Sequence, residues 1–220
     1  MIKGILIDID NTLYDYNVPH YQAMEDVYKF AHSYFNVNNF KKAFKNARNF
    51  VHDMLKNTAS SHNRLLYFQK TLEELGNHNY ILAKDLYDIY WNSFLDYMKL
   101  SDGIINFFEK NNDKEICFVT DLTAYIQYRK IEKLGLAKYV KYLVTSEEVG
   151  VEKPNRKNFE IALQKINLLP NEVCMIGDSY EKDILGALNL GIKPYWLTNN
   201  TCDDNRITVF KSFKELEIKE

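Results

Sequence analysis

The chain is poor in the residues that mark unusual protein classes: its 220 residues include 4 prolines, 8 glycines and 3 cysteines. So little Pro and Gly, with no low-complexity tract or internal repeat, excludes collagen-like and disordered chains. No apolar run approaches the roughly 18 to 20 residues of a membrane span. The N-terminus also reaches Asp8 too soon for a secretory signal. We therefore expect a cytoplasmic globular protein.

The chain also has no large excess of positive or negative charge, since its formal net charge is −2. We accordingly expect neither a nucleic-acid polymer nor a membrane as a partner, and nothing indicates an oligomeric state. The three cysteines lack the paired spacing of a zinc site. Cys117 and Cys174 lie in apolar, strand-like runs and Cys202 in a polar loop, so we expect reduced thiols, the first two buried.

The first 98 residues contain two patterns of apolar residues that differ in their periodicity. A short apolar run, Ile5–Ile7, predicts a buried strand, and residues 17–98 then repeat apolar residues at helical spacing. Four helices are expected at about 18–35, 39–56, 61–75 and 80–98. We predict that 17–98 form an inserted helical cap domain, and that 1–16 and 99–220 form the core.

From residue 101 helices and strands alternate, with strand-like runs at 115–120, 141–146, 172–178 and 194–198. This alternation is typical of right-handed crossovers and predicts an α/β fold with a doubly wound, parallel, Rossmann-like sheet. Ligands of such sheets bind beyond the carboxyl ends of the strands. The strand ends are therefore where chemistry is expected.

Polar side chains follow four of these strands. The residues at the strand ends are Asp8 and Asp10, Thr120 and Asp121, Lys153, and Asp178 with Asp183. Converging carboxylates favour a hard divalent cation, and Mg²⁺ is commonly held by one or two of them together with water and phosphate oxygens. A lysine and a hydroxyl add the positive charge and the donor that an anionic substrate needs.

These residues occur in "DIDNTL", "FVT", "EKP" and "IGDSYEKD", which resemble, in order, the four signature motifs of the haloacid dehalogenase-like superfamily. The helical segment between the first two motifs resembles the helical cap of that superfamily. Within it, "VTSEEVGVEKPNRKNFEIAL" most resembles nucleoside monophosphate phosphatases and N-acylneuraminate-9-phosphatase-like enzymes.

The resemblance implies a covalent mechanism. Asp8 would attack phosphorus and form an aspartyl-phosphate, while Asp10 would protonate the leaving oxygen and then take a proton from water. Thr120 and the backbone N–H groups of the turn at Asn11 would bind phosphoryl oxygens, with Lys153 stabilising phosphate and Asp8. The Mg²⁺ ligands would be Asp8, the backbone carbonyl of Asp10, Asp178 and Asp183, the last directly or through water.

Simpler roles are open for several of these residues. Asp178 could instead cap the following helix and Asp183 could be an acid of its first turn. Asp121-Leu122 stands where many relatives have Asn-Gly, which puts a negative charge beside the phosphate site. We expect Asp121 to lie among the substrate-binding residues.

Two residues of the helical segment, His62 and Arg64, are candidate substrate contacts because they cluster polar groups in "SSHNRLLYF". A helix N-cap at Ser60 or Ser61 explains the same stretch. We expect a Mg²⁺-dependent phosphatase of a small phosphate ester such as a nucleoside monophosphate or sugar phosphate. The alternatives are a phosphomutase, a haloacid dehalogenase or a non-catalytic binding module.

Overall fold

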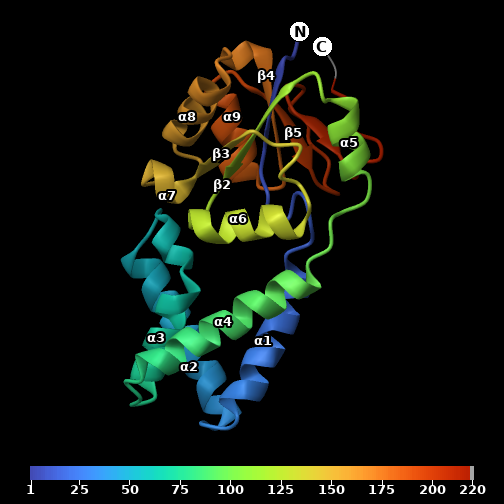
Figure 1. Cartoon of the computed structure of the whole chain (residues 1–220). Helices are drawn as coiled ribbons and strands as arrows, with labels where there is room; N and C mark the ends of the chain where they lie inside the picture. The colour runs from blue at the N-terminus through green and yellow to red at the C-terminus, as the bar shows by residue number, and fades with distance from the viewer. Residues whose placement is uncertain (219–220) are drawn as a thin grey trace. The chain divides into compact units, whose positions relative to one another are not determined.

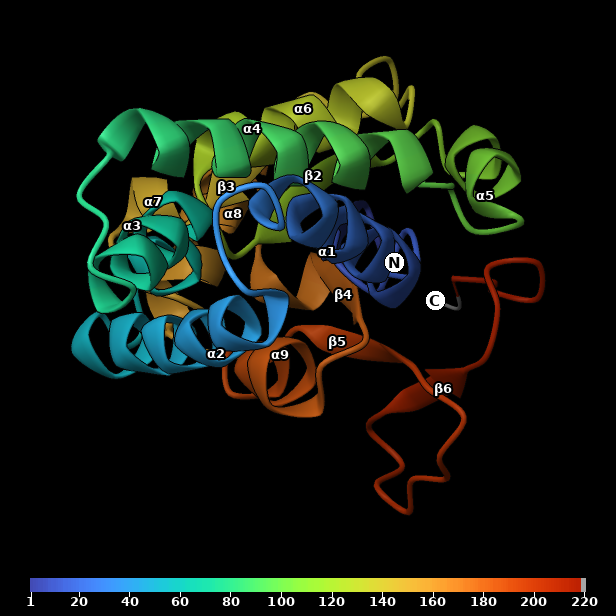
Figure 2. The same ribbon diagram turned by 90° about the horizontal axis from the view of Figure 1, so that it is seen from below.

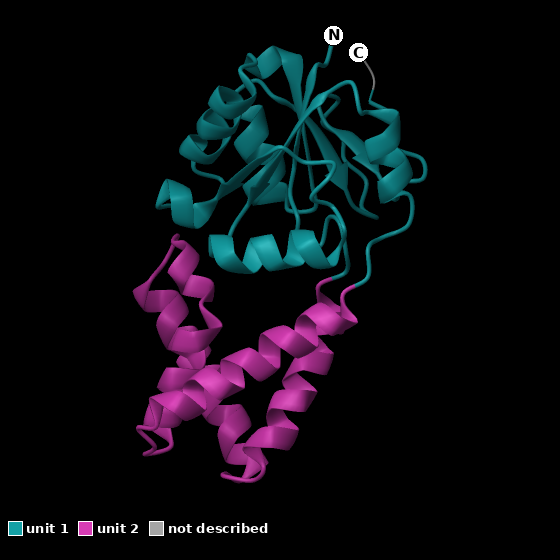
Figure 3. Ribbon diagram, viewed as in Figure 1, with its two compact units in different colours: residues 1–15, 99–220 teal, residues 16–98 magenta. Residues whose placement is uncertain are grey.

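The computed structural model describes residues 1–218, which form two compact units (Figure 1). Unit 1 consists of residues 1–15 and 99–220, and unit 2 of residues 16–98 (Figure 3). Among residues 1–218 no helix combines the length and apolar character needed to cross a bilayer.

Unit 1 contains a six-stranded parallel sheet in the order β3-β2-β1-β4-β5-β6. Figure 2 shows β2 and β3 toward one side of this sheet and β5 and β6 toward the other. The strands are β1 Gly4–Ile7, β2 Glu115–Thr120, β3 Tyr142–Thr145, β4 Val173–Gly177, β5 Lys193–Leu197 and β6 Thr208–Phe210. The first strand is central, with β2 on one side and β4 on the other. The chain therefore winds outward in both directions, and the predicted doubly wound α/β fold is confirmed.

Strand alternation explains how the sheet is covered on both faces. Cys117 and Val119 belong to the core cluster that also contains Phe159 of helix α8, whereas the intervening Phe118 packs its ring against Phe108 of helix α5. The helical elements of unit 1 are α5 Ile104–Lys110, α6 Ala124–Lys133, α7 Ser146–Val149, α8 Arg156–Ile166, the 3₁₀ turn Pro170–Glu172, the π-helical segment Tyr180–Leu185 and α9 Gly186–Leu188.

Unit 2 contains the helices α1 Asn17–Ala31, α2 Val37–Met54, α3 Arg64–Glu74 and α4 Tyr80–Tyr97, with a 3₁₀ turn at Ala59–His62. Its helix α1 packs against α4, and α2 against α3. Asn36, Asn63 and Asn79 cap the last three helices by accepting backbone N–H bonds. The core is aromatic and includes fully buried Phe40, Phe68 and Phe94, which accounts for the high aromatic content of this segment.

Two details of these elements differ from expectation. Strand β6 was not predicted, because its three residues are too few to show a period. The alternative of a helix N-cap at Ser60 or Ser61 is wrong, since the Asn63 side chain caps α3 by accepting the Leu65 N–H at 2.9 Å. The prediction for the strand cysteines is confirmed: Cys117 and Cys174 are buried free thiols, and burial raises the pKa of each to about 12.

Candidate functional site

The site is organised around the carboxyl end of β1, where the sheet changes its winding direction. Asp8 follows β1 directly, Asp178 follows β4, and the two strands are hydrogen-bonded neighbours. Asp8 is only 6% exposed although it carries a carboxylate. Burying a charge is costly unless it is paired, so the groups around Asp8 determine what the site can hold.

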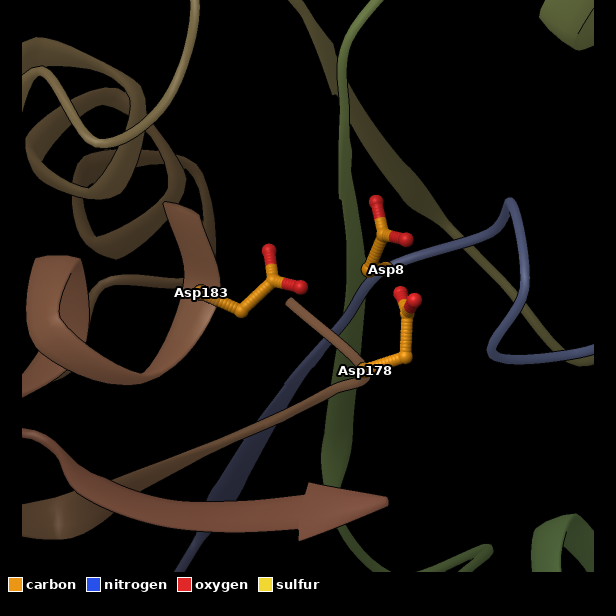
Figure 4. Close-up of side chains that lie close together, drawn as sticks. All are labelled: Asp8, Asp178 and Asp183. Atoms are coloured by element: carbon orange, nitrogen blue, oxygen red, sulfur yellow. The ribbon is translucent and has the colours of Figure 1, made fainter. Parts of the chain in front are cut away.

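Three carboxylates converge at this point: Asp8, Asp178 and Asp183 (Figure 4). Each offers one oxygen, and the three oxygens lie within 4.8 Å of one another. They come from the end of β1, the end of β4 and the π-helical segment after β4. Residues far apart in the sequence thus supply a single oxygen-rich cluster.

Lys153 supplies a positive charge to the cluster. Its Nζ donates to Asp8 Oδ1 at 2.6 Å, to Asp183 Oδ1 at 2.7 Å and to the Val119 carbonyl at 2.9 Å. The lysine is 3% exposed. All three ammonium protons therefore have acceptors, and the amine is fixed in position rather than mobile in solvent.

The backbone between Asp178 and Asp183 is shaped by a close approach. A Cβ on Gly177 would lie 2.3 Å from Asp183 Oδ2, so only glycine fits there. The Ser179 N–H donates to Asp183 Oδ2 at 3.1 Å, and the Ser179 hydroxyl accepts the Lys182 N–H at 3.3 Å. Ser179 is thus the N-cap residue, the alternative of a capping role for Asp178 is wrong, and Asp183 serves the first turn while also pairing with Lys153.

The electrostatics show a surplus of negative charge. Burial, opposed by Lys153, raises the pKa of Asp8 well above its ordinary value. Burial and then the charge of Asp183 raise the pKa of Asp178 to about 6. Three carboxylates face one ammonium group, and this imbalance is what a bound divalent cation would offset.

The cluster fits a magnesium ion by its donor chemistry. All donors are carboxylate oxygens, the ligands that Mg²⁺ prefers. An octahedral ion with bonds of about 2 Å brings its ligand atoms to within about 3 to 4 Å of each other, and the three carboxylate oxygens lie within 4.8 Å of one another. Thr12 Oγ1 contacts both Asp8 Oδ2 and Asp178 Oδ1, at 3.4 and 3.3 Å.

The end of β2 delivers Thr120, which is 1% exposed. Its hydroxyl accepts from Gln127 Nε2 at 2.8 Å. The next residue, Asp121, uses both carboxylate oxygens within the chain: Oδ1 accepts the Lys153 N–H at 3.0 Å and Oδ2 pairs with Lys182 Nζ at 2.8 Å. Lys182 Nζ also contacts Glu152 Oε2 at 3.1 Å. It therefore offsets part of the negative charge of Asp121, a compensation that was not predicted from the sequence.

The backbone of the turn after Asp8 also departs from expectation. Asn11 has a φ of 60°, in the left-handed region that asparagine tolerates. The N–H groups of Thr12 and Leu13 donate to the Ile9 carbonyl at 3.3 and 3.0 Å. Of the N–H groups in this turn, those that precede Thr12 are then the candidates for binding an anion.

Asp10 lies among three donors that the sequence analysis missed. Lys130 Nζ and the Tyr14 hydroxyl donate to its Oδ1, the former at 2.5 Å, and Gln127 Nε2 donates to Oδ2 at 3.1 Å. The burial of Asp10 favours the neutral acid, but the charge of Lys130 and these hydrogen bonds outweigh it and lower the pKa of Asp10. A signal was available: Gln127 and Lys130 are polar residues at i, i+3 beside apolar Ile126 on α6.

The two candidate residues of unit 2 contact each other. Arg64 Nη1 donates to the His62 carbonyl at 2.6 Å, and Nη2 donates to the Tyr16 hydroxyl. The guanidinium also lies over the rings of Tyr67 and Tyr90, at 5.3 and 5.6 Å from their centroids. Both residues lie within unit 2.

Comparison with known proteins accounts for this arrangement. The family model for haloacid dehalogenase-like hydrolases matches residues 2–191, which is most of the chain. The chain belongs to this family. The family expected from the four motifs is thereby confirmed, and all four motifs lie inside the matched range.

Several known proteins match over nearly the whole chain. A ribulose-1,5-bisphosphate 5-phosphatase of Halopiger xanaduensis is 34% identical over 204 residues, covering 88% of this chain and 83% of that protein. The human N-acylneuraminate-9-phosphatase is 25% identical over 214 residues, covering 90% and 84%. A solved 2-haloacid dehalogenase of Pseudomonas syringae has the same fold, with a TM-score of 0.79 at 18% identity, covering 97% of this chain and 96% of that one.

Proposed function

We propose that the protein is a Mg²⁺-dependent phosphomonoesterase that hydrolyses a small phosphate ester through an aspartyl-phosphate on Asp8. The observation that carries the proposal is the Asp8, Asp178 and Asp183 cluster with Lys153 bonded to Asp8. Relatives named as phosphatases of ribulose bisphosphate and of N-acylneuraminate phosphate support the substrate class.

In this proposal Asp8 is the nucleophile. One of its carboxylate oxygens bonds to phosphorus while the bond from phosphorus to the leaving oxygen breaks. Asp10 takes part in its protonated form, with the proton on Oδ2, and gives that proton to the leaving oxygen. Water then attacks the phosphorus of the aspartyl-phosphate, Asp10 takes its proton, and free phosphate leaves. Lys153 orients Asp8 through Oδ1, at 2.6 Å, and its charge stabilises the phosphoryl group.

Asp8, Asp178, Asp183 and the backbone carbonyl of Asp10 would hold Mg²⁺ in this scheme. The ion supplies positive charge that offsets the repulsion between the carboxylate nucleophile and a phosphate dianion. Thr120 and the backbone N–H groups between Asp8 and Asn11 would contact phosphoryl oxygens. For Asp121 we propose a supporting role, because its two carboxylate oxygens accept from the Lys153 N–H and from Lys182.

For unit 2 we propose the role of a cap domain that selects the leaving group, with Arg64 and His62 among its substrate contacts. The support is electrostatic. The described partners of the Arg64 guanidinium are a carbonyl, hydroxyl groups and aromatic rings, so none of them neutralises its charge. A partly buried cation with neutral neighbours suits a negatively charged or carbonyl-bearing substrate.

The test is phosphate release from p-nitrophenyl phosphate and from panels of nucleoside monophosphates and sugar phosphates, with Mg²⁺ or with EDTA. We expect release that requires Mg²⁺ and falls at least about 10³-fold in Asp8→Asn. The matched control is Asp113→Asn, because the Asp113 side chain is 70% exposed and its ion pair within residues 1–218 is with its neighbour Lys114.

Each alternative has its own outcome in this assay. Isomerisation of a sugar phosphate with little free phosphate would identify a phosphomutase. Halide release from a 2-haloacid, without phosphate release, would identify a dehalogenase. Equal phosphate release by Asp8→Asn and the wild type would refute Asp8 as the nucleophile, and no turnover of any compound would leave a binding module.

A further inference from the structure

The carboxylate of Asp10 is held from the inside of unit 1 and open on its other side. Its side chain is 29% exposed, whereas that of Lys130, which pairs with it, is 0% exposed. The buried Lys130 ammonium group therefore contacts the Asp10 carboxylate from the core side. Oδ1 receives both Lys130 and the Tyr14 hydroxyl, and Oδ2 receives only the 3.1 Å bond from Gln127 among residues 1–218.

Gln127 ties this carboxylate to the end of β2. Its Nε2 also lies 2.8 Å from Thr120 Oγ1 and 2.7 Å from the Asp121 carbonyl. The amide is fully buried, and within residues 1–218 its Oε1 has no hydrogen-bond partner. Leaving a buried oxygen unpaired is unfavourable. The orientation of the amide is consequently determined by the acceptors that Nε2 reaches, Asp10 among them.

We propose that Lys130, Gln127 and Tyr14 are positioning residues that fix the Asp10 carboxylate for proton transfer. With Oδ1 occupied by two donors, the side chain has one orientation, and Oδ2 is the oxygen left to face a leaving group or a water. Proton transfer requires such a fixed geometry, because the donor and acceptor atoms must come within hydrogen-bond distance. The inference rests on the proposed function, since it concerns the acid–base step of that reaction.

A pair of substrates separates positioning from general structural support. The phenol of p-nitrophenyl phosphate leaves with little help from an acid, whereas the alcohol of glycerol 3-phosphate needs a proton as it leaves. Loss of Asp10 positioning therefore slows the alkyl ester more than the aryl ester. A loss of stability or of folded protein slows both esters by the same factor.

The variants are Lys130→Met, which removes the charge and keeps the length, together with Gln127→Leu and Tyr14→Phe. We expect Lys130→Met to raise the ratio of kcat for aryl over alkyl ester at least tenfold, with smaller changes in KM. The conservative Lys130→Arg should restore part of the ratio. The control is Lys165→Met, because Lys165 bonds the Leu143 carbonyl and Glu148 away from Asp10, and its ratio should match the wild type.

The outcomes distinguish the inference from the proposed function. If Asp10→Asn raises the ratio and Lys130→Met, Gln127→Leu and Tyr14→Phe all leave it at the wild-type value, the positioning role is refuted while the phosphatase stands. If the wild type releases no phosphate from either ester, the proposed function itself fails. If Lys130→Met does not fold, Gln127→Leu and Tyr14→Phe decide the question by the same ratio.

Discussion

Replacing Asp178 by asparagine should change the stability of the protein in opposite directions with and without Mg²⁺. Burial and the neighbouring Asp183 raise the pKa of Asp178 from an ordinary value of 3.8 to about 6. An acid with a raised pKa in the folded state binds more protons folded than unfolded between these two values. Stability therefore falls as the pH rises from about 4 to 6 and stays low above that.

The size of the effect follows from the shift. A shift from 3.8 to about 6 corresponds to about 3 kcal/mol at most, and partial exposure of the carboxyl reduces this to about 1–2 kcal/mol. In EDTA at pH 7.5, Asp178→Asn should unfold about 3–6 °C higher than the wild type. Asparagine keeps an Oδ1 acceptor for Thr12, so this hydrogen bond is not the cause of any difference.

The measurement is thermal unfolding of both proteins at pH 4.5 and 7.5, in EDTA and in Mg²⁺. In EDTA the advantage of the variant should shrink at pH 4.5, because wild-type Asp178 is then largely protonated when folded. In Mg²⁺ at pH 7.5 the order should reverse. An ion at 100 times its Kd stabilises the protein that binds it by about 2.7 kcal/mol, and the variant offers the ion a neutral amide oxygen in place of a carboxylate. A variant that is less stable than the wild type in EDTA at pH 7.5 would refute this reasoning.

Two further substitutions test the backbone around the site. Gly177→Ala would place a Cβ 2.3 Å from Asp183 Oδ2, so we expect a loss of about 1–3 kcal/mol of stability in urea unfolding and weaker Mg²⁺ binding by calorimetry; wild-type values for both would contradict the close approach. Leu122 has a φ of 102°, so Leu122→Gly should be about 1 kcal/mol more stable than Leu122→Ala, and the reverse order would exclude strain at this position.

The parts of the fold that the sequence predicts are those that repeat a pattern. The buried run Gly4–Ile7 and the alternation after residue 101 were sufficient for the doubly wound sheet. The four expected helices of unit 2 begin within three residues of the observed starts. The three residues Thr208–Phe210 form a strand only because β5 offers them a free edge, and a local pattern contains no information on such an edge.

The same distinction applies to the candidate site. Asp8, Asp178 and Lys153 could be located because each follows a strand, and parallel strands bring their carboxyl ends to one edge. The donors to Asp10 could not be located so easily. Lys130 comes from the middle of a helix, and its contact with Asp10 depends on how α6 packs, which the sequence pattern of one helix does not specify.

The central place of β1 in the sheet has a consequence for the order in which the chain folds. Gly4 pairs with Glu115 on one side and with Val173 on the other. During synthesis the first apolar strand emerges early, yet its second neighbour is made only when most of the chain has left the ribosome. Unit 2, which is one continuous stretch of the chain, can fold in that interval. The strand that leads into Asp8 is then the one that waits longest for its partners, so chaperone dependence and aggregation should be most sensitive to changes in Gly4–Ile7.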